Sequence, residues 1–140
     1  MNPRTKKNLT DAIECTAFDA TQYNRFAARA RMEDEWHIAE LFQEMADTDR
    51  TEYFPKEAEI AGLIGSSPDN LRNAMDSDRK EIKMFIRFAR EAKEDGDIDI
   101  SSLFEKIGCE RAKRYAHFED ALRAMGIHSN VWTVDHSQPL

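Results

Sequence analysis

Hydrophobic residues recur along most of the chain at alternating steps of three and four positions, which is the spacing of one face of an α-helix. Proline and glycine, which interrupt helices, gather between these periodic segments, at Pro3, in residues 62–68, at Gly96, at Gly126 and at Pro139. We therefore predict an all-α chain with four helices. Their predicted ranges are residues 5–33, 34–60, 68–93 and 101–125.

Local signals support the ends of these helices. Ser66 followed by Pro68 fits a helix start, with a capping serine and a proline in the first turn. Ser101 or Ser102, with Glu105 close behind, predicts a similar start for the fourth helix. Pro55 stands late in the second segment, where we expect it to kink or end the helix.

Pairs of charged residues interrupt the apolar stripe near the middle of three of the four predicted helices. These pairs are Asp49 with Glu52, Asp78 with Glu81, and Arg111 with Arg114. Four helices joined by short loops pack as an antiparallel bundle, so their stripes meet on its axis and the pairs would share one layer. Four acids and two arginines leave a net charge of −2 in this layer. Buried charges persist when they neutralise one another or bind an ion. The alternative is that the helices are rotated and the pairs face solvent.

Composition narrows the possible partners and location. The 140 residues carry a formal net charge of −7, which argues against nucleic acid because its phosphates would be repelled. No apolar run is long enough to span a membrane or to serve as a signal peptide, so we expect a cytoplasmic protein. Cys15 and Cys109 belong to no CxxC pair, which argues against a four-cysteine zinc or iron site. We interpret them as half-buried small apolar side chains.

Several separate stretches resemble the rubrerythrins, a ferritin-like family, and they occur in the same order. The matching stretches are residues 26–31, 38–47, 69–72, 88–96 and 103–107, and the resemblance covers most of residues 5–122. It implies one ferritin-like, antiparallel four-helix bundle over residues 1–126, a tail over residues 127–140, and a homodimer. No CxxC pairs follow the predicted bundle, so we expect the rubredoxin domain of full rubrerythrins to be missing.

The resemblance also implies a site. In rubrerythrins a pair of irons lies at the bundle centre, where the enzyme reduces hydrogen peroxide. Its ligands are a glutamate on the first helix, Glu-x-x-His on the second, Glu-x-x-Glu on the third and Glu-x-x-His on the fourth. Carried over by position, they fall on Thr16, Asp49, Glu52, Asp78, Glu81, Arg111 and Arg114.

Arginine changes the chemistry expected at this site. It is always protonated and offers only donors, so Arg111 and Arg114 cannot ligate a metal, whereas their planar forks can bind carboxylates. We therefore predict no cofactor, with the guanidinium groups balancing the charge that iron would balance. His37 and His117 lie outside the charged layer and do not restore the ligands. His128 and His136 belong to the tail.

Three functions remain open at this point. The first is a metal-free family member that acts as a structural or protein-interaction module, with Trp132 in the tail as a possible contact for a partner or for the chain itself. The second is an iron peroxidase or oxidase active against oxidative stress, whose all-carboxylate site comprises Asp49, Glu52, Asp78 and Glu81. The third is a thiol-based redox protein that uses Cys15 and Cys109, because a nearby guanidinium can lower the pKa of a thiol.

Overall fold

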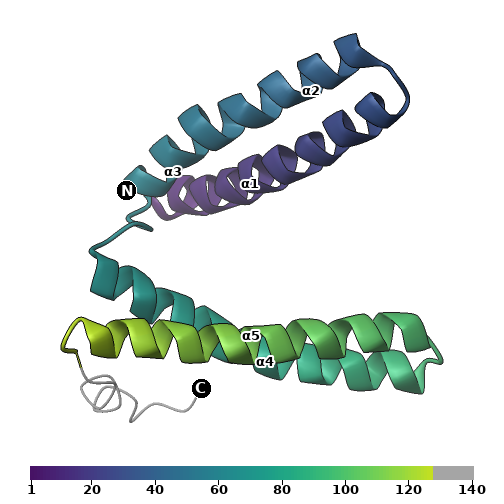
Figure 1. The fold of residues 1–140 in the computed structure, drawn as a ribbon. Helices are drawn as coiled ribbons and strands as arrows, with labels where there is room; N and C mark the ends of the chain where they lie inside the picture. Colours follow the sequence, from purple (N-terminus) through teal and green to yellow (C-terminus); the bar gives the residue numbers. More distant parts are fainter. Residues whose placement is uncertain (128–140) are drawn as a thin grey trace. The chain divides into compact units, whose positions relative to one another are not determined.

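The computed structural model describes residues 1–127, which form helices joined by short turns (Figure 1). The chain divides into two compact units, Met1–Ile64 and a second unit that begins at Gly65. The predicted all-α class is confirmed, with four long helical segments close to the predicted ranges. The helices are α1 (Pro3–Met32), α2 (Trp36–Thr48), the π-helix η1 (Asp49–Tyr53), α3 (Phe54–Ile60), α4 (Ser67–Glu94) and α5 (Ile98–Ala124).

The first unit is a helical hairpin. Helix α1 runs antiparallel to the continuous run of α2, η1 and α3 (Figure 1). It begins at a cap, since the Arg4 N–H donates to Asn2 Oδ1 at 2.9 Å. Alanines occupy the contact between the two arms, and their small side chains allow the helices to approach closely. The buried alanines are Ala27, Ala30, Ala39, Ala46 and Ala58.

The second unit is a hairpin of α4 and α5, which also run antiparallel (Figure 1). Met75 and Leu122 are its largest fully buried apolar side chains. Three aromatic rings also pack against one another in this hairpin, in tilted and edge-on arrangements with centroids 5.6–6.0 Å apart, at Phe85, Phe88 and Phe104.

Two predicted helix starts have different outcomes. The Asp69 N–H donates to Ser66 Oγ at 3.3 Å, and Pro68 stands in the first turn of α4, so this start is confirmed. The start at Ser101 or Ser102 is wrong, because α5 begins one turn earlier at Ile98. Ser101 is buried instead, and its hydroxyl donates to the Ala89 carbonyl at 2.7 Å. A long-range hydrogen bond, rather than a cap, therefore explains this serine.

Pro55 neither ends the second predicted helix nor leaves it regular. The chain passes through the π-helix η1, where the Phe54 N–H bonds to the Asp49 carbonyl five residues back. Proline lacks an N–H and its ring crowds the carbonyl of the residue four positions earlier, here Thr51. We attribute the wide turn to relief of this crowding. The Thr51 hydroxyl also donates to the Asp47 carbonyl at 2.7 Å.

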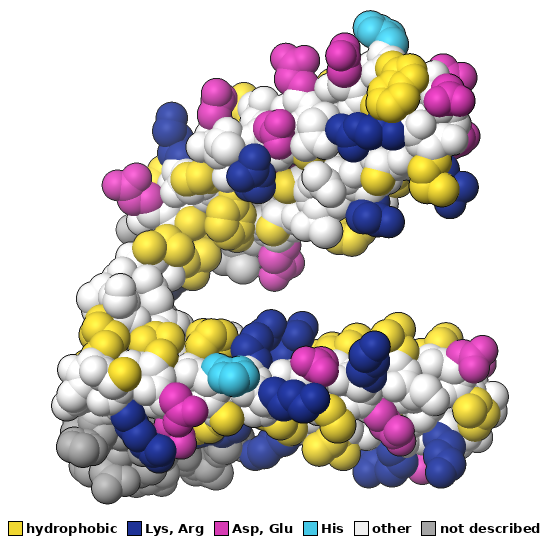
Figure 2. All heavy atoms as spheres, viewed as in Figure 1, with side chains coloured by type: hydrophobic (Ala, Val, Ile, Leu, Met, Phe, Trp, Pro, Cys, Tyr) yellow, Lys and Arg dark blue, Asp and Glu magenta, His cyan; other side chains and the backbone are white. Residues whose placement is uncertain are grey.

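The described residues leave two predictions about organisation untested. Each hairpin is compact by itself, so the single domain over residues 1–126 stays a prediction. The tail contacts suggested for Trp132, and the positions of His128 and His136, lie outside the described residues. None of the described helices combines the length and the apolar character needed to cross a lipid bilayer. Hydrophobic side chains remain visible on the surfaces of both hairpins, among the charged ones (Figure 2).

Candidate functional site

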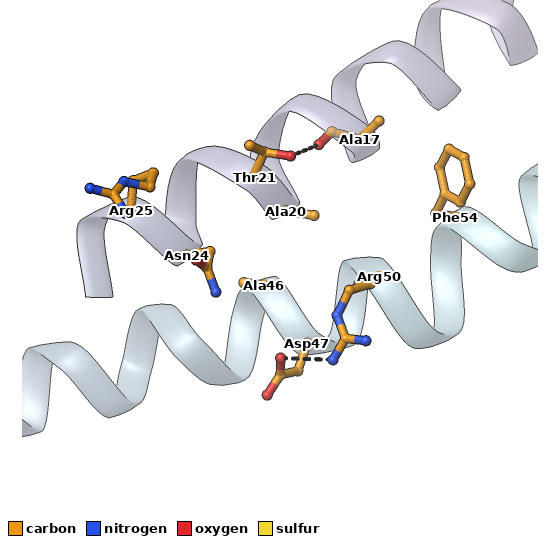
Figure 3. A pocket seen from close by; sticks show the side chains of 9 residues that line it. All are labelled: Ala17, Ala20, Thr21, Asn24, Arg25, Ala46, Asp47, Arg50 and Phe54. Carbon is orange, nitrogen blue, oxygen red and sulfur yellow. Dashed lines mark hydrogen bonds and ion pairs between the residues drawn. The ribbon is translucent and has the colours of Figure 1, made fainter. Parts of the chain in front are cut away.

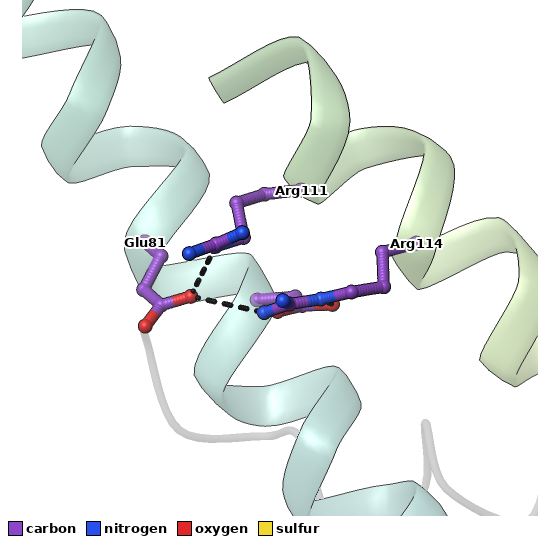
Figure 4. A network of polar contacts seen from close by, with 4 residues as sticks. Glu81, Arg111 and Arg114 are labelled. Atoms are coloured by element: carbon purple, nitrogen blue, oxygen red, sulfur yellow. Dashed lines mark hydrogen bonds and ion pairs between the residues drawn. The ribbon is translucent and has the colours of Figure 1, made fainter. Parts of the chain in front are cut away.

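Four of the seven candidate site residues meet within the second hairpin (Figure 4). Asp78 and Glu81 lie one turn apart on α4, and Arg111 and Arg114 lie one turn apart on α5. Side chains three positions apart share a helix face, so the antiparallel helices bring the two pairs together. Arg111 Nε lies 2.9 Å from Glu81 Oε2, and Arg114 Nη2 lies 3.4 Å from the same oxygen.

Asp78 is the most deeply buried member of this Arg–carboxylate network. Its side chain is 1% exposed, whereas that of Arg114 is 43% exposed. Arg114 covers the carboxylate with both arms of its fork. Nε donates to Oδ2 at 3.0 Å, and Nη2 donates to Oδ1. The hydrogen bond to Asp78 raises the pKa of Arg114, so the guanidinium stays charged wherever the carboxylate is ionised. A paired charge of this kind avoids the penalty of an isolated buried carboxylate.

Arg111 and Glu81 form the more exposed half of the network. Their side chains are 28% and 35% exposed, so water screens this pair more than the pair at Asp78. The Arg111 guanidinium also lies 6.0 Å from the centre of the Phe85 ring, within range of a cation–π contact. Two arginines and two carboxylates make the network neutral within one hairpin.

The donor set of the network does not fit a metal ion. A metal cation bound at Asp78 would lie beside the permanent positive charge of Arg114, whose guanidinium donates to both oxygens of this carboxylate. Both arginines approach the same oxygen of Glu81, and guanidinium groups themselves offer only N–H donors. Across residues 1–127, no three histidine, cysteine or acidic side chains are grouped so that they could hold an ion.

Thr16 lies in the first hairpin, where it contacts an acid that the sequence analysis missed. Its hydroxyl donates to Glu57 Oε1 at 2.8 Å. Glu57 Oε2 is buried and has no hydrogen-bond partner among the described residues. A regular helix would direct Lys56 inward, but Lys56 is exposed, because the π-helix adds a residue to the turn before it. Pro55 was the available signal for this change of register.

Asp49 and Glu52, the remaining acids of the predicted layer, also lie in the first hairpin. Asp49 is half-buried and lines a hollow of about 460 Å³ together with Tyr23 and Tyr53, whereas Glu52 is exposed. These two acids and Thr16 belong to one compact unit and the Arg–carboxylate network to the other, so a single layer that joins all seven residues stays a prediction.

A second hollow of the first hairpin contains none of the candidate residues. It has a volume of about 370 Å³ and lies between α1 and the α2–η1 arm (Figure 3). Alanines form part of its wall, and Arg50 beside it pairs with Asp47 at 3.2 Å. Asn24 and Arg25 also line this hollow.

Within residues 1–127, neither the two cysteines nor His37 and His117 belong to the Arg–carboxylate network. Cys15 and Cys109 are exposed, so the interpretation as half-buried side chains is wrong. Cys109 precedes Arg111 by two residues, and such positions point about 200° apart on a helix. Cys109 therefore faces away from the guanidinium that was expected to activate it. His37 and His117 are also exposed.

Comparison with known proteins identifies the family. No protein-family model matches the chain. A curated relative, a rubrerythrin of Porphyromonas gingivalis (strain ATCC BAA-308 / W83), is 30% identical over 142 aligned positions, which cover 84% of this chain and 68% of the relative. The chain belongs to the rubrerythrin family.

Proposed function

We propose that this rubrerythrin-family protein has lost its diiron centre to an arginine–carboxylate cluster and acts as a structural or protein-interaction module. The observation that carries the proposal is the fork of Arg114 on the buried carboxylate of Asp78. This contact uses the oxygens that a metal would need and places a permanent positive charge beside them. The same argument applies, more weakly, to Arg111 and Glu81.

In this proposal the arginine–carboxylate cluster stabilises the second hairpin. A buried Asp78 without a counter-charge would destabilise the hairpin by several kcal/mol, on the order of the penalty for an unpaired buried ion. Arg114 supplies that counter-charge from the neighbouring helix. The two arginines thus hold α4 and α5 together at the level where the family uses a metal. We propose that such a protein works in the cytoplasm by binding other proteins, with a second copy of itself among them.

Metal content is the measurement that tests this proposal. The protein would be expressed with added iron, purified without chelator and analysed by mass spectrometry of the elements, together with a thermal unfolding curve. We expect well below one metal per chain in a folded, stable protein. One or two metals per chain would contradict the proposal. The carboxylate-ligated oxidoreductase would then be favoured, and peroxide reduction would be the next assay.

A variant that restores the family's ligands on the fourth helix tests directly whether the arginines displaced a metal. Arg111→Glu combined with Arg114→His restores the Glu-x-x-His pair expected on the fourth helix of the family. We expect this variant to retain more iron than the wild type, and added iron to raise its melting temperature, because the new ligands free the oxygens of Asp78. Arg123→Ala, an exposed change on the same helix, is the matched control and should bind no additional iron. Equal iron content in revertant and wild type would count against a displaced metal site.

A further inference from the structure

The second hairpin carries an apolar groove between α4 and α5. Its volume is about 560 Å³, and none of the four residues of the Arg–carboxylate network lines it. Most of its lining is apolar or lacks a side chain, namely Ile82, Ile86, Ala89, Phe104, Gly108 and Ala112. Ile86 keeps 63% of its surface exposed. Small-molecule sites commonly have volumes of about 300–1,000 Å³ and mostly apolar walls, so this groove has the size and the lining for a small apolar ligand.

The charged residues of the groove gather at one end. Arg90 and Lys93 lie near the end of α4, whereas Glu105 lies in the first half of α5. The two helices are antiparallel, as the hydrogen bond from Ser101 to Ala89 shows, so the three charged residues border the same end. The opposite end of the groove is apolar.

The α4 side of this charged end is positive, although the chain as a whole carries a net charge of −7. Arg90 lies 3.8 Å from Glu94, but both side chains are exposed and water screens the pair. Glu91 pairs with Arg87, so Lys93 stands outside the ion pairs of this helix end. A bound anion would therefore find one cation that has no ion pair to break.

We propose that the groove binds a medium-chain fatty acid, with its carboxylate at Lys93 and Arg90 and its hydrocarbon chain along the apolar end. A ligand with one anionic head and one apolar tail matches a groove that is charged at one end only. From Ile82 to Lys93, α4 extends for about 16 Å at a rise of about 1.5 Å per residue, which is near the length of an extended chain of about a dozen carbons. The site is separate from the Arg–carboxylate network, so the inference is independent of metal loss.

Protection of a thiol tests this site in the full chain. Cys109 lines the groove, and Cys15, exposed in the first hairpin, is an internal reference. The protein would react with N-ethylmaleimide at increasing concentrations of decanoate, below micelle formation, and mass spectrometry of peptides would give the labelling rate of each thiol. We expect saturating decanoate to slow the labelling of Cys109 by about fivefold or more and to leave Cys15 unchanged, since groove ligands bury most of their surface. Decyltrimethylammonium has the same chain with a cationic head and should not protect Cys109 at these concentrations.

Two charge variants test the contact with the head group. Lys93→Gln should raise the decanoate concentration for half protection by about threefold, because it removes the exposed cation. Glu105→Gln should lower it by about the same factor, because it removes an acid that repels the carboxylate. Lys80→Gln removes a positive charge from an exposed position of α4 outside the groove and is the matched control. Equal half-protection concentrations for Lys93→Gln and Lys80→Gln would overturn the proposal.

A further variant tests the apolar contact without a change of charge. Ile86→Gln should raise the half-protection concentration by about fivefold, the effect of a partly buried isoleucine. Circular dichroism should show unchanged helix content, because Ile86 is exposed and glutamine is a good helix former. Ile60→Gln, at a position of the first hairpin that is 60% exposed, is the control and should behave like the wild type.

Three further results would overturn the proposal. The first is equal protection of Cys109 and Cys15 by decanoate, and the second is equal protection of Cys109 by the cationic amphiphile. The third is labelling of Cys109 that slows as the protein concentration rises without decanoate, because a second copy of the chain would then fill the groove.

Discussion

Asp78 and Arg114 form an ion pair in which the two side chains differ greatly in burial. The carboxylate is enclosed, with 1% of its side chain exposed, whereas 43% of the Arg114 side chain is exposed. Removal of the arginine leaves a charge in the core, whereas removal of an exposed arginine elsewhere on α5 leaves only a solvated partner. The energetic importance of an arginine here therefore follows from the burial of its partner.

Arg114→Ala should accordingly lower the free energy of unfolding by about 3 kcal/mol, at the lower end of the range for a broken buried pair because water can enter the space left by the side chain. Urea denaturation followed by circular dichroism measures the change. The control is Arg123→Ala, whose arginine pairs with Glu119 at 3.0 Å and is 54% exposed. It should cost less than about 1 kcal/mol. Equal midpoints for both variants would mean that Asp78 is not stranded by the loss of Arg114.

Arg114→Lys tests the same pair through its pH dependence. The pKa of Arg114 is raised above an already high value, so its stabilising effect is complete below that value and is lost only in extreme alkali. A lysine with its pKa raised by Asp78 would stabilise the fold fully below its unfolded pKa of about 10.4 and lose this contribution as the pH rises through its folded pKa. The difference in unfolding free energy between variant and wild type should therefore widen above about pH 10. A difference that stays constant would contradict a lysine–Asp78 pair.

At the level of helices, Ser101 links α5 to α4 where a cap was expected. Its buried hydroxyl satisfies the Ala89 carbonyl across the hairpin. We expect Ser101→Ala to destabilise the protein by about 1–2 kcal/mol, since the carbonyl would lose its additional partner inside the protein. Thermal unfolding is the measurement. Ser102→Ala, at the exposed neighbouring position, should be close to neutral, and a larger loss there would restore the capping interpretation.

The π-helix is the element that sequence periodicity predicted least well. A stripe at three- and four-residue steps assumes one regular helix from residue 34 to residue 60, but η1 widens the turn at residues 49–53. Every later position consequently faces a different direction, and Glu57 rather than Lys56 meets Thr16. The sequence contained the cause, Pro55, but not its outcome, since a proline can kink, end or widen a helix.

At the scale of the whole molecule, the chain consists of two helical hairpins and belongs to the rubrerythrin family. The metal measurement on the revertant and the wild type asks whether the second hairpin has exchanged ion binding for an internal ion pair.

Sequence by itself determined the helical class, the approximate helix ranges and the rubrerythrin relationship. It also predicted that two acids on one helix and two arginines on the next would lie on helix faces that meet, as Asp78, Glu81, Arg111 and Arg114 do. These properties depend on residues three or four positions apart, and such local spacing is visible in a sequence.

Only the tertiary structure decided which contacts those residues make. It selected Asp78 as the enclosed acid, joined Thr16 to Glu57, and gave Ser101 a partner on α4. These outcomes depend on the rotation of each helix and on its axial alignment with its neighbour. The packing of all side chains sets both quantities together, so no local pattern in the sequence specifies them.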